Sequence, residues 1–168
     1  GFFHPSSEPK QNDRFTCLSV GSWLRDYDAV LGVAQMLESR DDYHFRIVSG
    51  TITAPPGSRN VEVLSGIDDE ELRRVYQQAD VLLLPVTAAT ANNALLEGIA
   101  CGLPVISTDL PSVRAYVPGD QAILIPDNDA NLIVQALVTL RDHPELRSRM
   151  AVAAQRRARE LSWKRSAK

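Results

Sequence analysis

The chain has 168 residues, 44% of them hydrophobic, and a formal net charge of -3 at pH 7. This composition is typical of a soluble globular domain. The weakly acidic balance argues against nucleic acid or an anionic membrane as the main partner, and no apolar run reaches the roughly 20 residues that span a bilayer. The two cysteines, Cys17 and Cys101, fit neither a disulfide framework nor a metal-site spacing, which favours reduced thiols in a cytoplasmic protein.

Short apolar segments alternate with segments of helical periodicity along the chain. Six segments have the length and composition of strands, and they lie at residues 14–21, 43–50, 61–66, 81–84, 103–108 and 121–126. Five helices are expected to begin at residues 26, 68, 92, 129 and 144. This alternation predicts an α/β fold with a mostly parallel sheet and helices on both faces.

Residues 1–14 are polar and rich in proline, which is typical of a linker or lead-in. Because the chain begins at Gly1 rather than at Met, we expect it to be part of a longer protein with a preceding domain. Two helix starts carry capping signals: Asp68 with Glu71 forms a capping box, and Asp129 precedes an apolar helix face that is expected to include Leu132.

The stretch "TAATANNALLEGIACGLPVISTD" (87–109) follows a buried strand, and its helix should begin at the carboxyl end of that strand. Open α/β sheets bind ligands at this edge. Backbone N–H groups near Asn93, Ala94 and Leu95 are expected to be unpaired, so the helix end favours an anion. Taken alone, Asn92 is better explained as an ordinary N-cap, for which asparagine is among the best residues.

The sequence lacks the short motifs of several common enzyme classes. It contains no G-x-G, no G-x-x-x-x-G-K-[ST] and no G-x-S-x-G, and its three histidines are scattered. These absences argue against dehydrogenases, P-loop NTPases, hydrolases and metalloenzymes.

The segments "YQQADVLLLP" (76–85) and "TANNALLEGIACGLPVIST" (90–108) resemble the carboxyl-terminal half of a GT-B glycosyltransferase of the retaining family four, the glycosyl transferases group 1. "FTCLSVGSWLRDYD" resembles the family's first strand and glycine loop, and "GFFHP" resembles its interdomain linker. The resemblance implies a Rossmann-like domain at residues 15–168 that binds a nucleotide-sugar donor. Residues 1–14 would then join it to an N-terminal acceptor-binding domain.

The family's signature is a pair of glutamates separated by seven residues, and Glu97 matches the second, which in the family bonds the ribose hydroxyls of the donor. The first, which in the family contacts the donated sugar, is replaced by Ala89. Ser22 replaces the family's basic residue after Gly21, which leaves Arg25 as the nearest cation for the diphosphate. Because Glu97 lies on a mostly apolar helix, its charge needs a partner.

The expected donor-binding residues are Gly21, Ser22, Arg25, Ile67, Thr90, Asn92, Asn93, Ala94, Leu95 and Glu97. No catalytic residue is assigned, because part of that set is expected in the N-terminal domain. No metal or other cofactor is expected: the chain has no paired Asp or His cluster, and the family manages without one. The expected partners are the nucleotide-sugar donor and the N-terminal domain, with no nucleic acid, and any peripheral membrane association would run through that domain.

The predicted function is that of the donor-binding half of a retaining glycosyltransferase, which transfers a sugar from a nucleoside-diphosphate sugar to an unknown acceptor. The half alone is expected to be inactive in transfer. Two alternatives remain: a non-catalytic nucleotide-sugar binding module, favoured by Ala89 and Ser22, and a related GT-B nucleotide-sugar epimerase. Trp23 and Trp163 are expected to pack within the fold rather than to stack on a base.

Overall fold

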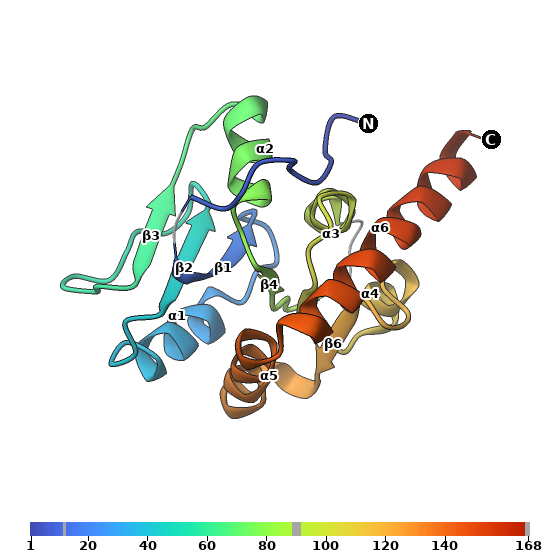
Figure 1. Ribbon diagram of the computed structural model, residues 1–168. Helices are drawn as coiled ribbons and strands as arrows, with labels where there is room; N and C mark the ends of the chain where they lie inside the picture. Colours follow the sequence, from blue (N-terminus) through green and yellow to red (C-terminus); the bar gives the residue numbers. More distant parts are fainter. Residues whose placement is uncertain (12, 89–91, 167–168) are drawn as a thin grey trace.

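The computed structural model describes residues 1–11, 13–88 and 92–166, with side chains through residue 162. A six-stranded sheet crosses its centre, in the order β3-β2-β1-β4-β5-β6 (Figure 1). The strands are β1 (Phe15–Val20), β2 (Tyr43–Val48), β3 (Val61–Leu64), β4 (Val81–Leu84), β5 (Val105–Thr108) and β6 (Ala122–Ile125). These strands pair in parallel throughout, and their order is that of a doubly wound Rossmann sheet.

Helices cover both faces of the sheet, which confirms the predicted fold class. They are α1 (Tyr27–Met36), α2 (Asp69–Gln77), α3 (Asn93–Ala100), α4 (Pro111–Tyr116), α5 (Ala130–Asp142) and α6 (Pro144–Ser166), with a short 3₁₀ turn η1 (Pro126–Asn128). One core cluster joins α1 and α5 to one face of the sheet, and a second joins α2, α3 and α4 to the other. The long helix α6 contributes Met150 to the first cluster and Ala154 to the second. No helix in the described part of the chain is long and apolar enough to cross a membrane.

The central strands are buried on both sides because alternate side chains point into the two core clusters. Leu82 and Leu83 are both 0% exposed, and they belong to opposite clusters. Two hydroxyls lie inside the sheet, and each donates to a neighbouring strand: Ser19 Oγ to Leu83 O at 2.6 Å and Ser107 Oγ to Leu84 O at 2.7 Å. The polar atoms that the sheet buries there therefore keep hydrogen-bond partners.

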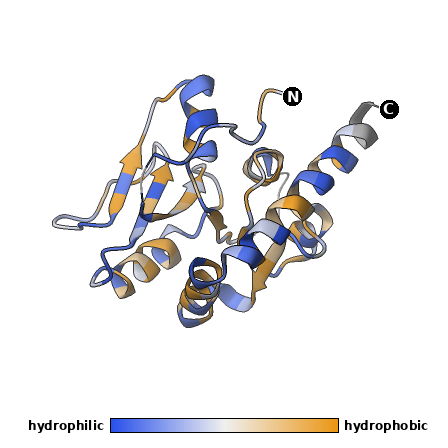
Figure 2. Ribbon diagram, viewed as in Figure 1, coloured by the Kyte–Doolittle hydropathy of each residue, from blue (hydrophilic) through white to orange (hydrophobic). Residues whose placement is uncertain are grey.

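Each expected strand and helix is present, and the capping signals are used. Asp68 Oδ1 accepts from Glu71 N at 2.8 Å, and Asp129 Oδ1 accepts from Leu132 N at 3.0 Å. Figure 2 shows α2 as mostly hydrophilic, in keeping with a helix whose buried residues are Val75 and Tyr76. This narrow apolar stripe is the side that packs on the sheet.

Two expectations about helices were incomplete or wrong. The helix α4 was not predicted, because it has only six residues and begins at Pro111 without a side-chain cap. Leu132 was expected on the buried face of α5 but is 37% exposed. The buried stripe of α5 starts at Ile133, and consecutive helical residues point about 100° apart.

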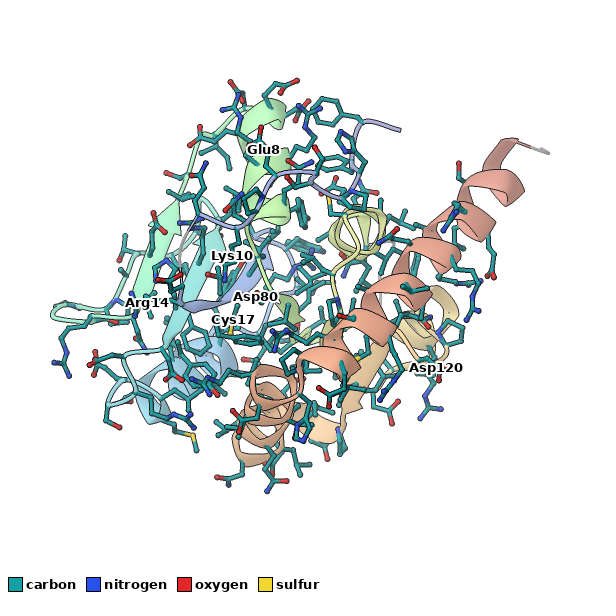
Figure 3. The ribbon with its side chains drawn as sticks, viewed as in Figure 1. Glu8, Lys10, Arg14, Cys17, Asp80 and Asp120 are labelled. Atoms are coloured by element: carbon teal, nitrogen blue, oxygen red, sulfur yellow. The ribbon has the colours of Figure 1, made fainter. Side chains whose placement is uncertain are left out.

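The segment that precedes β1 packs along the domain. The Lys10 ammonium pairs with the Asp80 carboxylate, and these two side chains lie together in Figure 3. Asp80 Oδ2 also accepts from Thr16 N at 2.7 Å, which links this ion pair to the start of β1. Near the chain start, the ring of Phe3 meets the ring of Tyr76 edge-to-face, with centroids 5.6 Å apart.

Gly98 permits the close approach of α3 to β4, and we expect Gly98→Ala to destabilise the domain. A Cβ at this position would lie 2.7 Å from Leu82 Cδ2, inside a fully buried side chain. Overpacking of this kind costs typically 1–3 kcal/mol, whereas the better helix propensity of alanine returns about 0.5–1 kcal/mol. The net loss, roughly 1 kcal/mol, is measurable by urea denaturation. The matched control is Gly32→Ala in α1, where a Cβ would meet nothing within 4 Å; equal stability changes in the two variants would contradict the packing argument.

Candidate functional site

The carboxyl ends of the strands bring most of the predicted residues to one edge of the sheet. Gly21 and Ser22 follow β1, Ile67 follows β3, and Asn92 precedes α3. Strand order reverses between β1 and β4, and ligands of such sheets bind in the crevice at this point. Thr90 and Ala89 lie outside the described residues, so their predicted roles stay predictions.

Arg25 connects the loop after β1 to the start of α3. Its Nε donates to Val20 O at 2.8 Å, its Nη1 to Trp23 O at 3.0 Å and its Nη2 to Asn92 Oδ1 at 3.3 Å. Burial lowers the pKa of the Arg25 guanidinium from its ordinary value, while the tyrosines Tyr27 and Tyr76 raise it. An arginine stays protonated in proteins, so a fixed positive charge stands at this edge.

Gly21 provides the space that the Arg25 guanidinium occupies. A Cβ at Gly21 would lie 2.8 Å from Arg25 Nη2, and the glycine has a φ of +110° that other residues rarely adopt. The neighbouring Ser22 hydroxyl lies 3.0 Å from the Ser49 hydroxyl. Together these contacts fix the loop against the ends of β1 and β2.

At the amino end of α3, one backbone N–H group that was expected to be unpaired has a partner. Leu95 N was expected to be unpaired, but it donates to Asn92 Oδ1 at 3.3 Å, because Asn92 serves as the N-cap. The N–H groups of Asn93 and Ala94 have no partner among the residues that the structure describes. Two donors at the positive end of the helix therefore face the edge of the sheet.

Glu97 lies half-buried in the second turn of α3, and its partner is a tyrosine. The Tyr76 hydroxyl donates to Glu97 Oε2 at 2.8 Å, and the side chain of Tyr76 is 0% exposed. Burial raises the pKa of the Glu97 carboxyl, the hydrogen bond from Tyr76 lowers it, and Asp69 raises it further. Ile67 packs against the same core cluster as Tyr76. The sequence did not identify Tyr76 as a site residue; the signal that could have done so is that a buried phenol needs a hydrogen-bond partner.

A second group of polar side chains at this edge was not predicted. Thr108 Oγ1 donates to Asn128 Oδ1 at 2.5 Å. Asn128 Nδ2 in turn donates to Asp26 Oδ2 at 2.9 Å and to Val86 O at 3.1 Å. Because Asp26 also caps α1 through Ala29 N, the network ties the ends of β4, β5 and β6 to that helix.

One of the two tryptophans contradicts its prediction. Trp23 was expected to pack in the fold, but it is 75% exposed. The Arg25 guanidinium, which donates to Val20 O and Trp23 O, occupies the position beneath this loop. The side chain of Trp163 lies outside the described part of the chain. In the described residues, no group of three or more His, Cys, Asp or Glu side chains is arranged to hold a metal ion.

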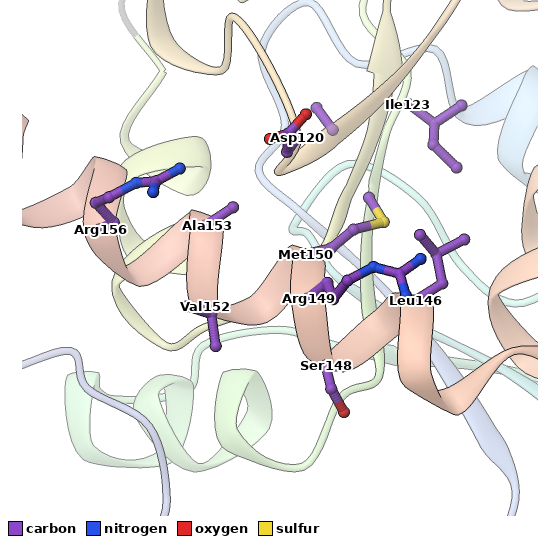
Figure 4. Close-up of a pocket in the computed structure, with 10 residues that line it drawn as sticks. Asp120, Ile123, Leu146, Ser148, Arg149, Met150, Val152, Ala153 and Arg156 are labelled. Carbon is purple, nitrogen blue, oxygen red and sulfur yellow. The ribbon is translucent and has the colours of Figure 1, made fainter.

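A cavity of about 780 Å³ lies between α6 and the beginning of β6. Figure 4 shows Leu146 and Met150 of α6 extending toward Ile123 of β6, with Asp120 and Arg156 farther along the cavity. It borders the amino-terminal end of β6, and its lining shares no residue with the predicted donor-binding set. The cavity and the candidate site are therefore separate.

Comparison with known proteins identifies the family. A family model described as "Glycosyl transferases group 1" matches residues 14–143. The D-inositol 3-phosphate glycosyltransferase of Corynebacterium efficiens is 30% identical over 78% of this chain and 35% of its own length. The D-rhamnosyltransferase WbpZ of Pseudomonas aeruginosa is 28% identical over 62% of this chain and 29% of its own length. The chain thus spans about a third of the length of these relatives.

Solved structures agree on the fold. The sucrose-phosphate synthase of Thermosynechococcus elongatus superposes with a TM-score of 0.79 at 19% identity, over 95% of this chain and 45% of that one. WaaG, a glycosyltransferase involved in lipopolysaccharide biosynthesis, gives 0.74 at 23% identity, over 88% of this chain and 43% of that one. Because the family model covers most of the sequence and the Rossmann-like fold agrees with it, the chain belongs to the glycosyl transferases group 1 family.

Proposed function

We propose that this chain is the donor-binding half of a retaining glycosyltransferase, which transfers a sugar from a nucleoside-diphosphate sugar to an acceptor. The observation that carries the proposal is the half-buried Glu97 carboxylate, held by Tyr76 in the helix that starts at the Arg25–Asn92 contact. A desolvated carboxylate at this edge suits a neutral ligand with two neighbouring hydroxyls, and ribose is such a ligand.

The same edge suits a diphosphate. Sugar transfer expels a nucleoside diphosphate, so negative charge develops on the leaving group. The N–H groups of Asn93 and Ala94 and the positive end of α3 favour that charge, and the Arg25 guanidinium stands beside them. Gly21 and Ser22 would line the phosphate side, and Ile67 would face the nucleoside next to Glu97.

The partners proposed for the whole protein are the nucleotide-sugar donor and an N-terminal acceptor-binding domain, which would supply part of the catalytic set. Any association with a membrane surface would occur through that domain, and no nucleic-acid partner is proposed. A cytoplasmic location is proposed, and the two free cysteines, Cys17 and Cys101, support it because both are buried thiols.

A non-catalytic nucleotide-sugar binding module is the second candidate. It is favoured by Ser22, whose hydroxyl lies 3.0 Å from the Ser49 hydroxyl and stands where the family has a basic residue. Both candidates bind a nucleoside diphosphate. Sugar transfer by the full-length protein is the property that separates them.

Glu97→Gln should weaken the binding of a ribonucleoside diphosphate by on the order of tenfold to a hundredfold, because hydrogen bonds to a charged group contribute roughly 1.5–3 kcal/mol. The measurement is a titration of UDP, GDP and ADP by calorimetry. The same substitution should reduce the affinity for the 2′-deoxy analogue of the tightest ligand by a smaller factor, since this analogue lacks one of the two hydroxyls. A thermal melt verifies that the variant is folded. Unchanged affinity in a folded variant would assign Glu97 to the structure alone.

Nucleotide binding should not depend on a divalent cation, since Arg25 and the N–H groups of α3 are proposed to meet the diphosphate. Addition of EDTA should leave the dissociation constant of the tightest nucleoside diphosphate nearly unchanged. A tenfold weakening, about 1.4 kcal/mol, would mean that a cation bridges the phosphates.

The 168-residue chain alone should bind a nucleoside diphosphate weakly and transfer no sugar. The reaction is proposed to occur between two domains, with the acceptor side supplied by the other one. The assay offers UDP-, GDP- and ADP-sugars with simple sugar acceptors, and it follows product by mass spectrometry. Transfer at a rate typical of enzymes would show that this chain is sufficient for catalysis.

A further inference from the structure

The hydroxyl of Tyr76 is a buried polar group that donates a hydrogen bond to Glu97. The tyrosine belongs to α2, its side chain is 0% exposed, and its hydroxyl donates to Glu97 Oε2 across the interface between α2 and α3. The Phe3 ring meets the Tyr76 ring edge-to-face at an interplanar angle of 82°. The phenol therefore has little freedom to turn away from Glu97.

We propose that Tyr76 is a positioning residue for the ribose site: its hydroxyl fixes the Glu97 carboxylate in one orientation and leaves the other oxygen free to meet the ribose hydroxyls. This inference rests on the donor-binding function proposed above and deepens it. Tyr76 itself does not touch the nucleotide in this scheme.

Fixing Glu97 lowers the entropic cost of binding. A glutamate side chain has several rotatable bonds, and ordering it on binding would oppose association. A carboxylate offers about four lone-pair positions. The bond from Tyr76 uses one of them, on Oε2, and Oε1 has no hydrogen-bond partner among the described residues. The free oxygen is therefore available to a ligand that brings two hydroxyl donors.

The same hydrogen bond maintains the charge of Glu97. Burial raises the pKa of this carboxyl and Asp69, at the start of α2, raises it further, while the Tyr76 bond lowers it. The other charged or titratable groups near this pair are Arg25 on the loop after β1 and Cys101 after α3, which both act on Tyr76. Loss of the hydroxyl should thus raise the pKa of Glu97, and ribose recognition should fail at a higher pH.

The test is Tyr76→Phe, which removes one oxygen atom and keeps the ring. The chain offers a matched control in Tyr43→Phe. Tyr43 is also 0% exposed, but it belongs to the core cluster on the opposite face of the sheet, and its hydroxyl has no hydrogen-bond partner within the described part of the chain. Both variants, Glu97→Gln and the parent chain are titrated with UDP, GDP and ADP and with the 2′-deoxy analogue of the tightest ligand, from pH 5 to pH 8.

Tyr76→Phe should weaken ribonucleotide binding about twofold to tenfold, which corresponds to the loss of one net hydrogen bond. The ratio of ribonucleotide to deoxynucleotide affinity should decrease. As the pH is lowered, Glu97 becomes protonated and the preference for the ribonucleotide disappears; in Tyr76→Phe, the midpoint of this decrease should lie at a higher pH than in the parent. Tyr43→Phe should leave the affinity, the ratio and the pH profile as in the parent. Asp69→Asn should move the pH profile downward, because it removes a charge that raises the pKa of Glu97.

The results separate this inference from the function on which it rests. If Glu97→Gln has no effect, the proposed ribose contact is wrong. If Glu97→Gln weakens binding but Tyr76→Phe matches Tyr43→Phe in ratio and pH profile, Glu97 needs no positioning and the inference is overturned. A Tyr76→Phe chain that does not fold would also overturn the inference, because the hydroxyl would then be required for folding rather than for positioning Glu97.

Discussion

Parallel pairing of β1 with β4 brings together the two segments that carry Arg25 and Asn92. These strands meet with Leu18 beside Leu82, although two strands and two helices separate them in the chain. Strand order reverses at this pair, and α1 and α3 leave the two strands toward opposite faces of the sheet. The loop after β1 and the start of α3 are therefore left facing each other across one crevice, where Arg25 can reach Asn92.

The bonds of Arg25 to the protein are compatible with a second role at a phosphate. A guanidinium has five N–H donors, and the contacts to Val20, Trp23 and Asn92 use one on each of its three nitrogens. Two N–H donors therefore remain, one on Nη1 and one on Nη2. An arginine already held in place loses little side-chain freedom when an anion arrives, so the internal bonds would improve an anion site rather than compete with it.

Sequence periodicity was sufficient for the fold because each strand and most helices are specified locally. A run such as 81–84 and a cap such as Asp68 act within a few residues. The site is less local. Tyr76 meets Glu97 across 21 positions and Asn128 meets Asp26 across 102, so only the sheet order brings them together. A single residue can also serve both as a helix cap and as part of the site: Asn92 caps α3, and its side-chain oxygen also accepts a hydrogen bond from Arg25.

Tyr76 links the segment before β1 to the geometry of the site. Its ring packs against Phe3, and its hydroxyl holds Glu97. Phe2 adds a second contact to α2, because the Arg73 guanidinium lies 4.6 Å from the centroid of its ring. The interior is closely packed and transmits displacement, so a shift of Phe3 would change the surroundings of the phenol that orients Glu97. The segment that resembles an interdomain linker is thus in contact with Tyr76, the residue whose hydroxyl holds the Glu97 carboxylate proposed to bind the ribose.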